Sequence, residues 1–244
     1  MRTDQDTIEG IPITLLRAAA GGSCAARGLV LCFHGFTSST ADWLHELERF
    51  AREGFAVVGV DCVGHGRRSG PGFERRFADP ATRDEALIEV VSATADEVPT
   101  LIDALLDRGL AAPGRIGAFG VSMGGFIVYA AVAKEPRLVA AVSLLGSPVW
   151  WMRPSAHGPH RDLEAFDRIH LLSLTAGRDE AVPAAHAADF HRRLARRFDD
   201  HAERLRHVDY PDSGHFMEPG DWDRAIGESR AWLRRHLGGE GGTR

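Results

Sequence analysis

The chain has few of the residues that would indicate a disulfide-stabilised or metal-binding protein. Its three cysteines, Cys24, Cys32 and Cys62, are odd in number and show no metal-ligand spacing. They therefore predict neither a disulfide framework nor a zinc site. His157 and His160 lie close together, but no carboxylate-rich cluster accompanies them, so we predict no metal site.

Long apolar runs and a strong net charge are also absent. No stretch approaches the roughly 20 apolar residues of a membrane span, and residues 1–10 lack the apolar core of a signal peptide. The formal net charge of −5 over 244 residues is modest, which argues against a nucleic-acid or anionic-membrane partner. We therefore expect a cytoplasmic protein with no nucleic-acid and no membrane partner. The sequence leaves its oligomeric state open.

What the sequence does contain is a regular alternation of strand-like and helix-like segments. Several strand-like runs are continuously apolar, as strands of a parallel sheet are when both faces are covered. The strand candidates are residues 13–18, 29–33, 56–61, 115–119, 139–145, 170–175 and 205–210. The helix candidates are residues 41–52, 84–108, 125–134, 184–198 and 222–237.

This alternation predicts an α/β fold with a doubly wound, mostly parallel sheet of seven to eight strands. We expect one domain over residues 1–237 and a flexible tail at 238–244. Pro99 should kink or divide the long second helix. Two irregular segments interrupt the pattern, one at 62–83 and one at 147–167. The second is long enough for a small lid but not for a large cap.

The segment Gly120-Val-Ser-Met-Gly124 matches the pattern G-x-S-x-G. It follows a strand candidate and directly precedes a helix candidate, and a sharp turn of this kind lifts the serine hydroxyl above the sheet. Glycines are needed at both ends because side chains there would obstruct the close approach of strand and helix. We predict that Ser122 is a nucleophile. The alternative is a glycine-rich turn with an idle serine.

A serine nucleophile needs a base, and the base needs an acid that orients it. In the order serine, acid, histidine, the histidine should follow the last strand, where His215 lies, and the acid should follow the strand before it, where Asp179 lies. Glu180 is the competing acid. His207 falls within a predicted strand, and His236 ends the last helix, where it suits the helix dipole. We therefore predict His215 as base and Asp179 as its orienting acid.

The attacked carbonyl needs backbone N–H groups that already point at the developing negative charge. The strand at 29–33 ends in His34-Gly35-Phe36, a tight turn that Gly35 permits. We predict that the N–H groups of Phe36 and Met123 form this oxyanion hole. His34 is expected to anchor the loop through hydrogen bonds rather than to act as a base.

Five motifs of the α/β-hydrolase superfamily follow one another in the family's order, each at a predicted strand end. They are His34-Gly-Phe36, Asp61-Cys-Val-Gly-His-Gly66, Gly120-Val-Ser-Met-Gly124, Asp179-Glu-Ala-Val-Pro183 and Gly214-His215. The sequence therefore resembles this superfamily. It is most similar to the small single-domain serine carboxylesterases, which are dienelactone-hydrolase-like or peptidase-S9-like. The resemblance implies hydrolysis of a small ester through an acyl-enzyme, without a metal or an organic cofactor.

The sequence also departs from particular members of this superfamily. Dienelactone hydrolases carry a cysteine in place of Ser122, and dehalogenases and epoxide hydrolases carry an aspartate. Ser69 stands one residue later than the serine of the D-x-x-G-H-G-x-S loop of many lipases, so a substrate role is not carried over to it. An acyltransferase or thioesterase with the same triad is one alternative function. A non-catalytic binding protein on a hydrolase scaffold is another.

The substrate-binding residues are less well defined by the sequence. Trp150, Trp151 and Met152 either line an acyl pocket or seal an edge of the hydrophobic core. The segment 62–83 contains a group of arginines that could recognise an anionic substrate, but interspersed acidic residues favour a solvated charged loop. These arginines are Arg67, Arg68, Arg75, Arg76 and Arg83.

Overall fold

The computed structural model describes residues 1–17, 27–153, 157–198 and 201–238. Within this part of the chain, eight strands form one open sheet in the order β1-β2-β4-β3-β5-β6-β7-β8. The strands are β1 (Arg2–Ile8), β2 (Ile11–Arg17), β3 (Leu29–Phe33), β4 (Ala56–Val60), β5 (Ile116–Val121), β6 (Leu138–Leu144), β7 (His170–Ala176) and β8 (Leu205–Tyr210). Cys24 and the predicted tail beyond Gly238 lie outside the described residues.

Strand β2 pairs antiparallel with both β1 and β4. The strands that follow in the sheet, in the order β4-β3-β5-β6-β7-β8, all pair in parallel. The predicted fold class, a doubly wound and mostly parallel α/β sheet, is therefore confirmed. Parallel strands place their carboxyl ends at one edge of the sheet, where loops of open α/β sheets form ligand sites. The residues predicted to be functional all follow strands at this edge.

Strand β1 is the one strand of the described sheet that the sequence did not predict. Its residues, Arg2–Ile8, are mostly polar and exposed, so they lack the apolar pattern of a buried strand. It forms a hairpin with β2 through a two-residue turn in which Glu9 has a φ of 51° and Gly10 a φ of 78°. Left-handed backbone at both central positions is typical of the tight turns that join antiparallel strands.

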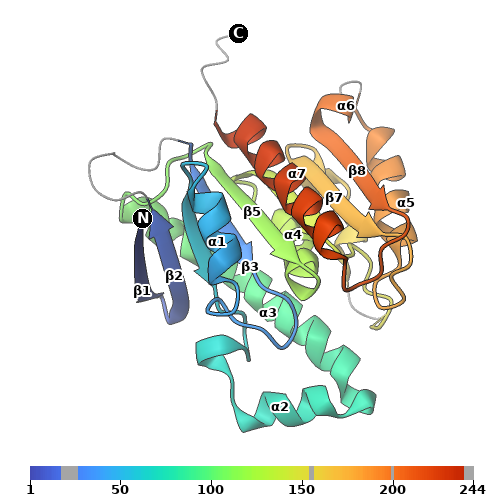
Figure 1. The fold of residues 1–244 in the computed structure, drawn as a ribbon, viewed down its shortest axis with the longest axis horizontal. Helices are drawn as coiled ribbons and strands as arrows, with labels where there is room; N and C mark the ends of the chain where they lie inside the picture. The colour runs from blue at the N-terminus through green and yellow to red at the C-terminus, as the bar shows by residue number, and fades with distance from the viewer. Residues whose placement is uncertain (18–26, 154–156, 199–200, 239–244) are drawn as a thin grey trace.

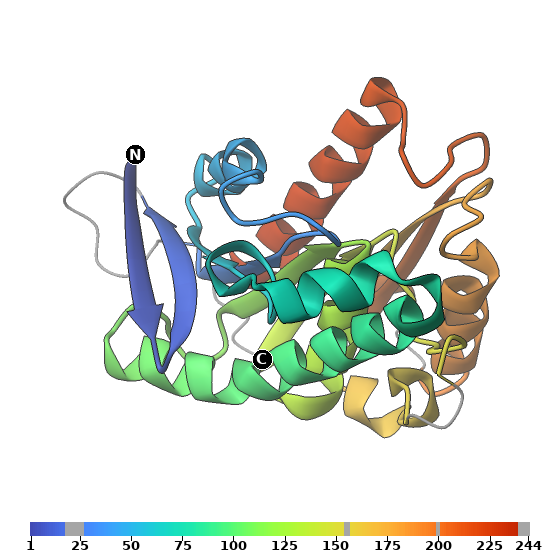
Figure 2. The same ribbon diagram turned by 90° about the horizontal axis from the view of Figure 1, so that it is seen from below.

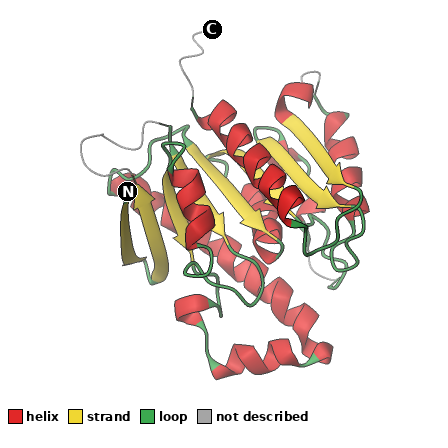
Figure 3. Cartoon of the chain, viewed as in Figure 1, coloured by secondary structure: helices red, strands yellow, loops and turns green. Residues whose placement is uncertain are grey.

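Helices cover both faces of the sheet, as Figures 1 and 2 show from two directions. One face carries α1 (Leu44–Ala51) and α7 (Pro219–Leu237), and the other carries α3 (Pro80–Asp107), α4 (Met123–Lys134) and α5 (Ala184–Ala195). A short helix, α6 (His201–Arg204), leads directly into β8. The colouring in Figure 3 makes the layered order of helix, sheet and helix visible.

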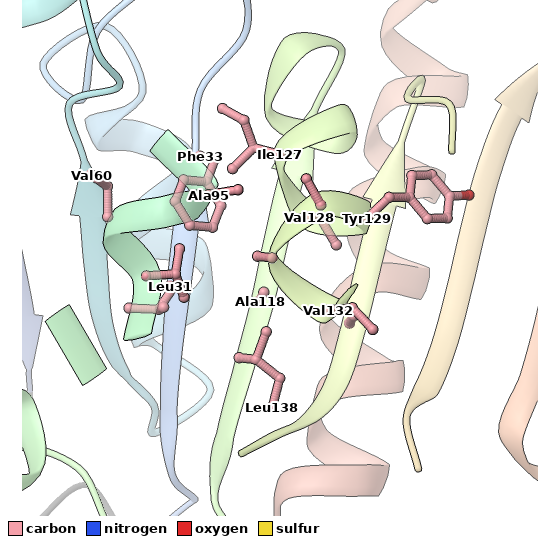
Figure 4. Close-up of a cluster of buried hydrophobic side chains, with 14 of the residues drawn as sticks. Leu31, Phe33, Val60, Ala95, Ala118, Ile127, Val128, Tyr129, Val132 and Leu138 are labelled. Carbon is pink, nitrogen blue, oxygen red and sulfur yellow. The ribbon is translucent and has the colours of Figure 1, made fainter. Parts of the chain in front are cut away.

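The larger of the two hydrophobic cores lies between the sheet and the layer of α3, α4 and α5. In the part of it drawn in Figure 4, Phe33 of β3 lies near Ile127 of α4, and Leu31 and Val128 belong to the same cluster. All four side chains are at most 1% exposed. Helix α4 is buried over most of its length, which fixes its first turn, and the serine before it, relative to β3 and β5.

Two expectations about the middle of the chain need correction. Pro99 does not divide helix α3, which runs through it without a break. The neighbouring Val98 and Leu101 are buried in the core, and their packing offsets the hydrogen bond that proline cannot donate. The segment 62–83 is not a loop but contains a 3-10 turn, helix α2 (Pro71–Ala78) and the start of α3. Figure 1 shows α2 beyond the carboxyl edge of the sheet.

Candidate active site

Ser122 occupies a strained turn between β5 and α4. Its φ of 53° and ψ of −116° lie in a region that side-chain-bearing residues rarely adopt, a conformation that costs on the order of 1–3 kcal/mol and often marks functional sites. The backbone N–H of Ser122 donates to the Leu144 carbonyl at 2.8 Å, and the Ser122 carbonyl accepts from the N–H of Phe126. The sheet and the helix thus hold the strained residue from both sides.

The glycines around Ser122 are required by close backbone contacts. A Cβ atom added to Gly120 would lie 2.1 Å from the carbonyl oxygen of Gly124, and one added to Gly124 would lie 2.1 Å from the carbonyl oxygen of Phe33. A Cβ on Gly125 would lie 2.8 Å from the Cα atom of Gly146. These obstacles are main-chain atoms of β3, of α4 and of the segment after β6, so they cannot move aside as a side chain would.

We expect Gly124→Ala to disturb the turn that carries Ser122. Overpacking of this kind typically costs about 1–3 kcal/mol, and a main-chain obstacle places this variant at the upper end. Gly227→Ala is the matched control, because Gly227 lies within α7 with nothing near its added Cβ and alanine favours a helix by about 1 kcal/mol. Denaturant unfolding compares the two. Equal stabilities of both variants would contradict the close contact at Gly124.

The structure brings Ser122, His215 and Asp179 together in one hydrogen-bonded series. The Oγ atom of Ser122 lies 2.9 Å from Nε2 of His215. Nδ1 of the same imidazole lies 2.7 Å from Oδ2 of Asp179. The Asp179 side chain is fully buried, and 22% of the His215 side chain is exposed. The three residues follow β5, β7 and β8 at the carboxyl edge of the sheet.

The second carboxylate oxygen of Asp179 is held by the backbone. Its Oδ1 atom accepts hydrogen bonds from the N–H groups of Ala181 at 2.9 Å and Val182 at 2.8 Å. Because Oδ1 is satisfied in this way, Oδ2 is left to accept the Nδ1–H of His215. That hydrogen bond selects the tautomer in which Nε2 carries a free lone pair and faces the Ser122 hydroxyl.

The competing residues lie elsewhere. Glu180 is exposed, although it adjoins Asp179 in the chain. The Nε2 atom of His207 lies 2.9 Å from Oγ1 of Thr175. His236 stacks on His170 with 4.0 Å between the ring centroids. In the described part of the chain, none of these residues forms a hydrogen bond or an ion pair with the side chain of Ser122 or His215.

The backbone N–H groups of Phe36 and Met123 have no hydrogen-bond acceptor among the described residues. Phe36 belongs to the loop after β3. Met123 is the first residue of α4, where N–H groups have no partner within the helix and attract negative charge. The two predicted donors are therefore available to an external acceptor.

His34 anchors the loop after β3, as the sequence predicts. Its Nδ1 donates to the Gly35 carbonyl at 2.8 Å, and its Nε2 accepts from the N–H of Cys62 at 3.2 Å. Burial lowers the pKa of His34, although the Gly35 carbonyl acts in the opposite direction. The imidazole is therefore neutral at pH 7, and both of its nitrogens are engaged.

Asp61 is an organising residue to which the sequence analysis gave no role. Its buried carboxylate accepts from Thr40 N–H at 3.0 Å and Thr40 Oγ1 at 2.8 Å, and from Arg67 N–H at 3.2 Å and Arg67 Nε at 2.8 Å. Burial alone would raise the pKa of Asp61, but hydrogen bonds from Arg67 and Thr40 outweigh it, so the pKa is lowered. This clamp joins the loop after β3 to the loop after β4.

We expect Asp61→Asn to lower the free energy of unfolding at pH 7 by about 2–3 kcal/mol, because the buried amide cannot accept from both partners as the carboxylate does. A carboxylate with a lowered folded-state pKa stabilises the fold above its ordinary value of 3.8 and loses that contribution as pH falls through the lowered pKa. The difference between variant and wild type should therefore shrink in acid. Unfolding titrations from pH 7 to pH 3 measure it, and a pH-independent difference would contradict the ionised clamp.

The other predicted binding residues have mixed environments. Trp150 is 6% exposed and belongs to the core, whereas Trp151 and Met152 are half-buried against it. Of the arginines in 62–83, three form ion pairs with acidic side chains. These pairs are Arg67–Asp61, Arg68–Glu97 and Arg76–Glu89. The paired arginines serve the packing of the loop and helices.

Among the described residues, no group of three or more His, Cys, Asp and Glu side chains could hold a metal ion. His157 is exposed, and Nδ1 of His160 lies 3.2 Å from the Pro148 carbonyl oxygen. Cys32 and Cys62 are buried and unpaired with each other. No helix within the described ranges is long and apolar enough to cross a membrane.

The strand order and the strained serine beside a histidine and a buried aspartate define an α/β-hydrolase. The sequence model of the family described as serine aminopeptidase, S33, matches residues 25–170, which is more than half of the chain. The chain belongs to this family.

Similar proteins of known sequence and structure agree with this class. YitV of Bacillus subtilis is 31% identical over 148 residues, and the monoacylglycerol lipase of Mycolicibacterium smegmatis is 32% identical over 123. These matches cover 61% and 50% of this chain and only 55% and 39% of the relatives. TT1662 from Thermus thermophilus has the same fold, with a TM-score of 0.76 at 21% identity, over 95% of this chain and 98% of that one.

Proposed function

We propose that this chain is a carboxylic ester hydrolase that acts through an acyl-enzyme on Ser122, with His215 as base and Asp179 as the orienting acid. The observation that carries the proposal is the unbroken hydrogen-bonded series from Ser122 Oγ to Asp179 Oδ2. The similarity to a protein named monoacylglycerol lipase and to one named esterase YjfP supports an ester as the substrate. We propose a small-molecule ester and no cofactor.

In the proposed reaction, His215 removes the proton of the Ser122 hydroxyl as its oxygen attacks the ester carbonyl. Asp179 holds the imidazole in the required tautomer and stabilises the imidazolium. The N–H groups of Phe36 and Met123 donate to the oxyanion. His215 then protonates the leaving alcohol, and a water molecule that it activates hydrolyses the acyl-enzyme and releases Ser122.

Trp151 is the residue that we propose beside the acyl group. Its ring lies 5.8 Å from that of Phe126, which follows Ser122 by about one helical turn and whose N–H bonds to the Ser122 carbonyl. Trp151 also lies 4.7 Å from the ring of His186, so it joins the segment after β6 to α5 near the serine. Trp150, which is buried in the core, is less accessible to a substrate.

A panel of p-nitrophenyl esters from acetate to palmitate tests the proposal. We expect hydrolysis of at least the shorter esters by the wild-type protein, and none above background by Ser122→Ala. The serine aminopeptidase description of the family makes aminoacyl-p-nitroanilides the natural second panel. Hydrolysis of these amides without hydrolysis of any ester would overturn the proposal that the substrate is an ester.

A further inference from the structure

Helix α2 contributes two aromatic rings to the carboxyl edge of the sheet. Phe73 and Phe77 stand one turn apart and are half-buried, whereas Glu74, Arg75 and Ala78 of the same helix are exposed. In Figures 1 and 2, α2 lies alongside the beginning of α3 and outside the layers that cover the sheet. The two rings are therefore the main apolar attachment of α2 to the rest of the protein.

The ring of Phe77 packs directly on the loop that carries the proposed oxyanion donor. Its centroid lies 4.7 Å from that of Phe36, and the two rings meet at 88°, edge to face. His65 lies 5.1 Å from Phe77 and 5.7 Å from Phe36. Aromatic pairs of this geometry attract one another beyond the effect of the area that they bury. Phe36, His65 and Phe77 thus form one aromatic cluster.

Phe73 is attached to a different part of the structure. It stacks on Phe77 with 5.9 Å between centroids, and its ring fills the space beside Gly64, where an added Cβ would lie 2.6 Å from it. Phe73 makes no ring contact with Phe36. The two phenylalanines of α2 therefore differ in one respect that an experiment can use: Phe77 alone has a ring contact with Phe36.

The peptide plane between Gly35 and Phe36 is held at its carbonyl end, because the Gly35 carbonyl accepts from His34 Nδ1 at 2.8 Å and from Ser38 N–H at 3.4 Å, but not at the end that carries Phe36. The Phe36 N–H makes no hydrogen bond to a described residue, and the next residue, Thr37, is exposed with a φ of 59°. The side chain and the N–H of Phe36 are attached through the same Cα atom. A contact that fixes the ring therefore also limits rotation of the peptide plane that presents the N–H.

We propose that Phe77 is a positioning residue, which aims the Phe36 N–H at the oxyanion through the contact between their rings. This inference rests on the proposed function, since it assumes that Phe36 donates to the oxyanion. Charge on the carbonyl oxygen grows in the transition state, so a misaligned donor weakens transition-state binding more than substrate binding. The inference predicts an effect on kcat with little effect on KM.

Phe77→Ala tests this role. Loss of a whole oxyanion donor costs roughly 10²–10³ in kcat, so a loosened donor should lower kcat about 10-fold, while KM changes less than about two-fold. Affinity for an alkyl boronic acid, whose tetrahedral adduct imitates the oxyanion, should fall by the same factor as kcat. Phe77→Leu keeps an apolar side chain on the same helix face and should recover much of the lost kcat. This variant also serves as the test if Phe77→Ala folds poorly.

Phe73→Ala is the matched control, since it removes the same ring from the same helix one turn earlier. We expect its kcat to stay within about three-fold of the wild type. Equal losses in the two variants would overturn the proposal, because packing of α2 in general would then be responsible. An unchanged kcat in Phe77→Ala, or a raised KM at unchanged kcat, would overturn it as well.

The rate at which a fluorophosphonate labels Ser122 separates this inference from the proposed function. Labelling requires the nucleophile, its base and the oxyanion hole, but not a particular ester. If the wild type is labelled and yet hydrolyses no ester, the proposed ester substrate is wrong. The positioning role of Phe77 can still be tested by the labelling rates. In that case a slower labelling rate for Phe77→Ala than for Phe73→Ala supports it, and equal rates contradict it.

Discussion

Ser122→Ala is expected to lower kcat for p-nitrophenyl butyrate by roughly 10⁴–10⁶, because the proposed acyl-enzyme cannot form without the hydroxyl. Stability should change little, since among the described residues the side chain forms a hydrogen bond only with His215. Removing the hydroxyl also leaves the strained backbone of residue 122 in place. The measurement is steady-state hydrolysis with protein purified to the same standard as the wild type, together with a thermal melt.

Ser69→Ala is the matched control for this variant. Ser69 is an exposed serine in the loop after β4, where many lipases carry a serine one position earlier. We expect its kcat to remain within about two-fold of the wild type. If Ser122→Ala retains a tenth or more of the wild-type kcat, a second nucleophile or a direct attack by water must be responsible, and the acyl-enzyme account is wrong.

Asp179→Asn is expected to lower kcat by roughly 10⁴, for a reason that the local hydrogen bonds supply. The N–H groups of Ala181 and Val182 both donate to the Oδ1 position, so the amide oxygen of asparagine must occupy it. The amide NH₂ then faces Nδ1 of His215 and can only donate to it. The proton of the imidazole moves to Nε2, where it points at Ser122, and the base is lost.

Glu180→Gln makes the same chemical change at the adjacent, exposed residue. Its kcat should stay within about two-fold of the wild type, and both variants should unfold near the wild-type temperature. The tautomer itself is observable, because ¹⁵N NMR of the imidazole distinguishes a proton on Nδ1 from one on Nε2. An Asp179→Asn variant that keeps the Nδ1–H form, or that loses less than ten-fold in kcat, would show that Asp179 does not orient the histidine.

The fold class and the positions of the three proposed triad side chains could be predicted because each depends on local sequence. Apolar runs marked most of the strands, and Ser122, Asp179 and His215 follow the predicted strands that are β5, β7 and β8 in the structure. The order of parallel strands then brings such positions to one edge of the sheet. Phe36 and Met123 were predictable in the same way, since their N–H groups depend only on where β3 ends and α4 begins.

Features that depend on tertiary contacts could not be found in this way. Strand β1 is polar, and the structure pairs it with β2 through a turn. Helix α2 was missed because its Gly, Pro and Arg content suggested a loop; Pro71 at its first turn was a signal that could have found it. Nothing in the sequence shows that Phe77 contacts Phe36, because 41 residues separate them.

Attack of Ser122 on the ester carbon is tested most directly by mass spectrometry of the protein after inactivation with a fluorophosphonate. We predict one adduct per chain, located in the peptide that contains Ser122, and a loss of esterase activity in proportion to its formation. An adduct on another residue, or full esterase activity in completely labelled protein, would contradict it.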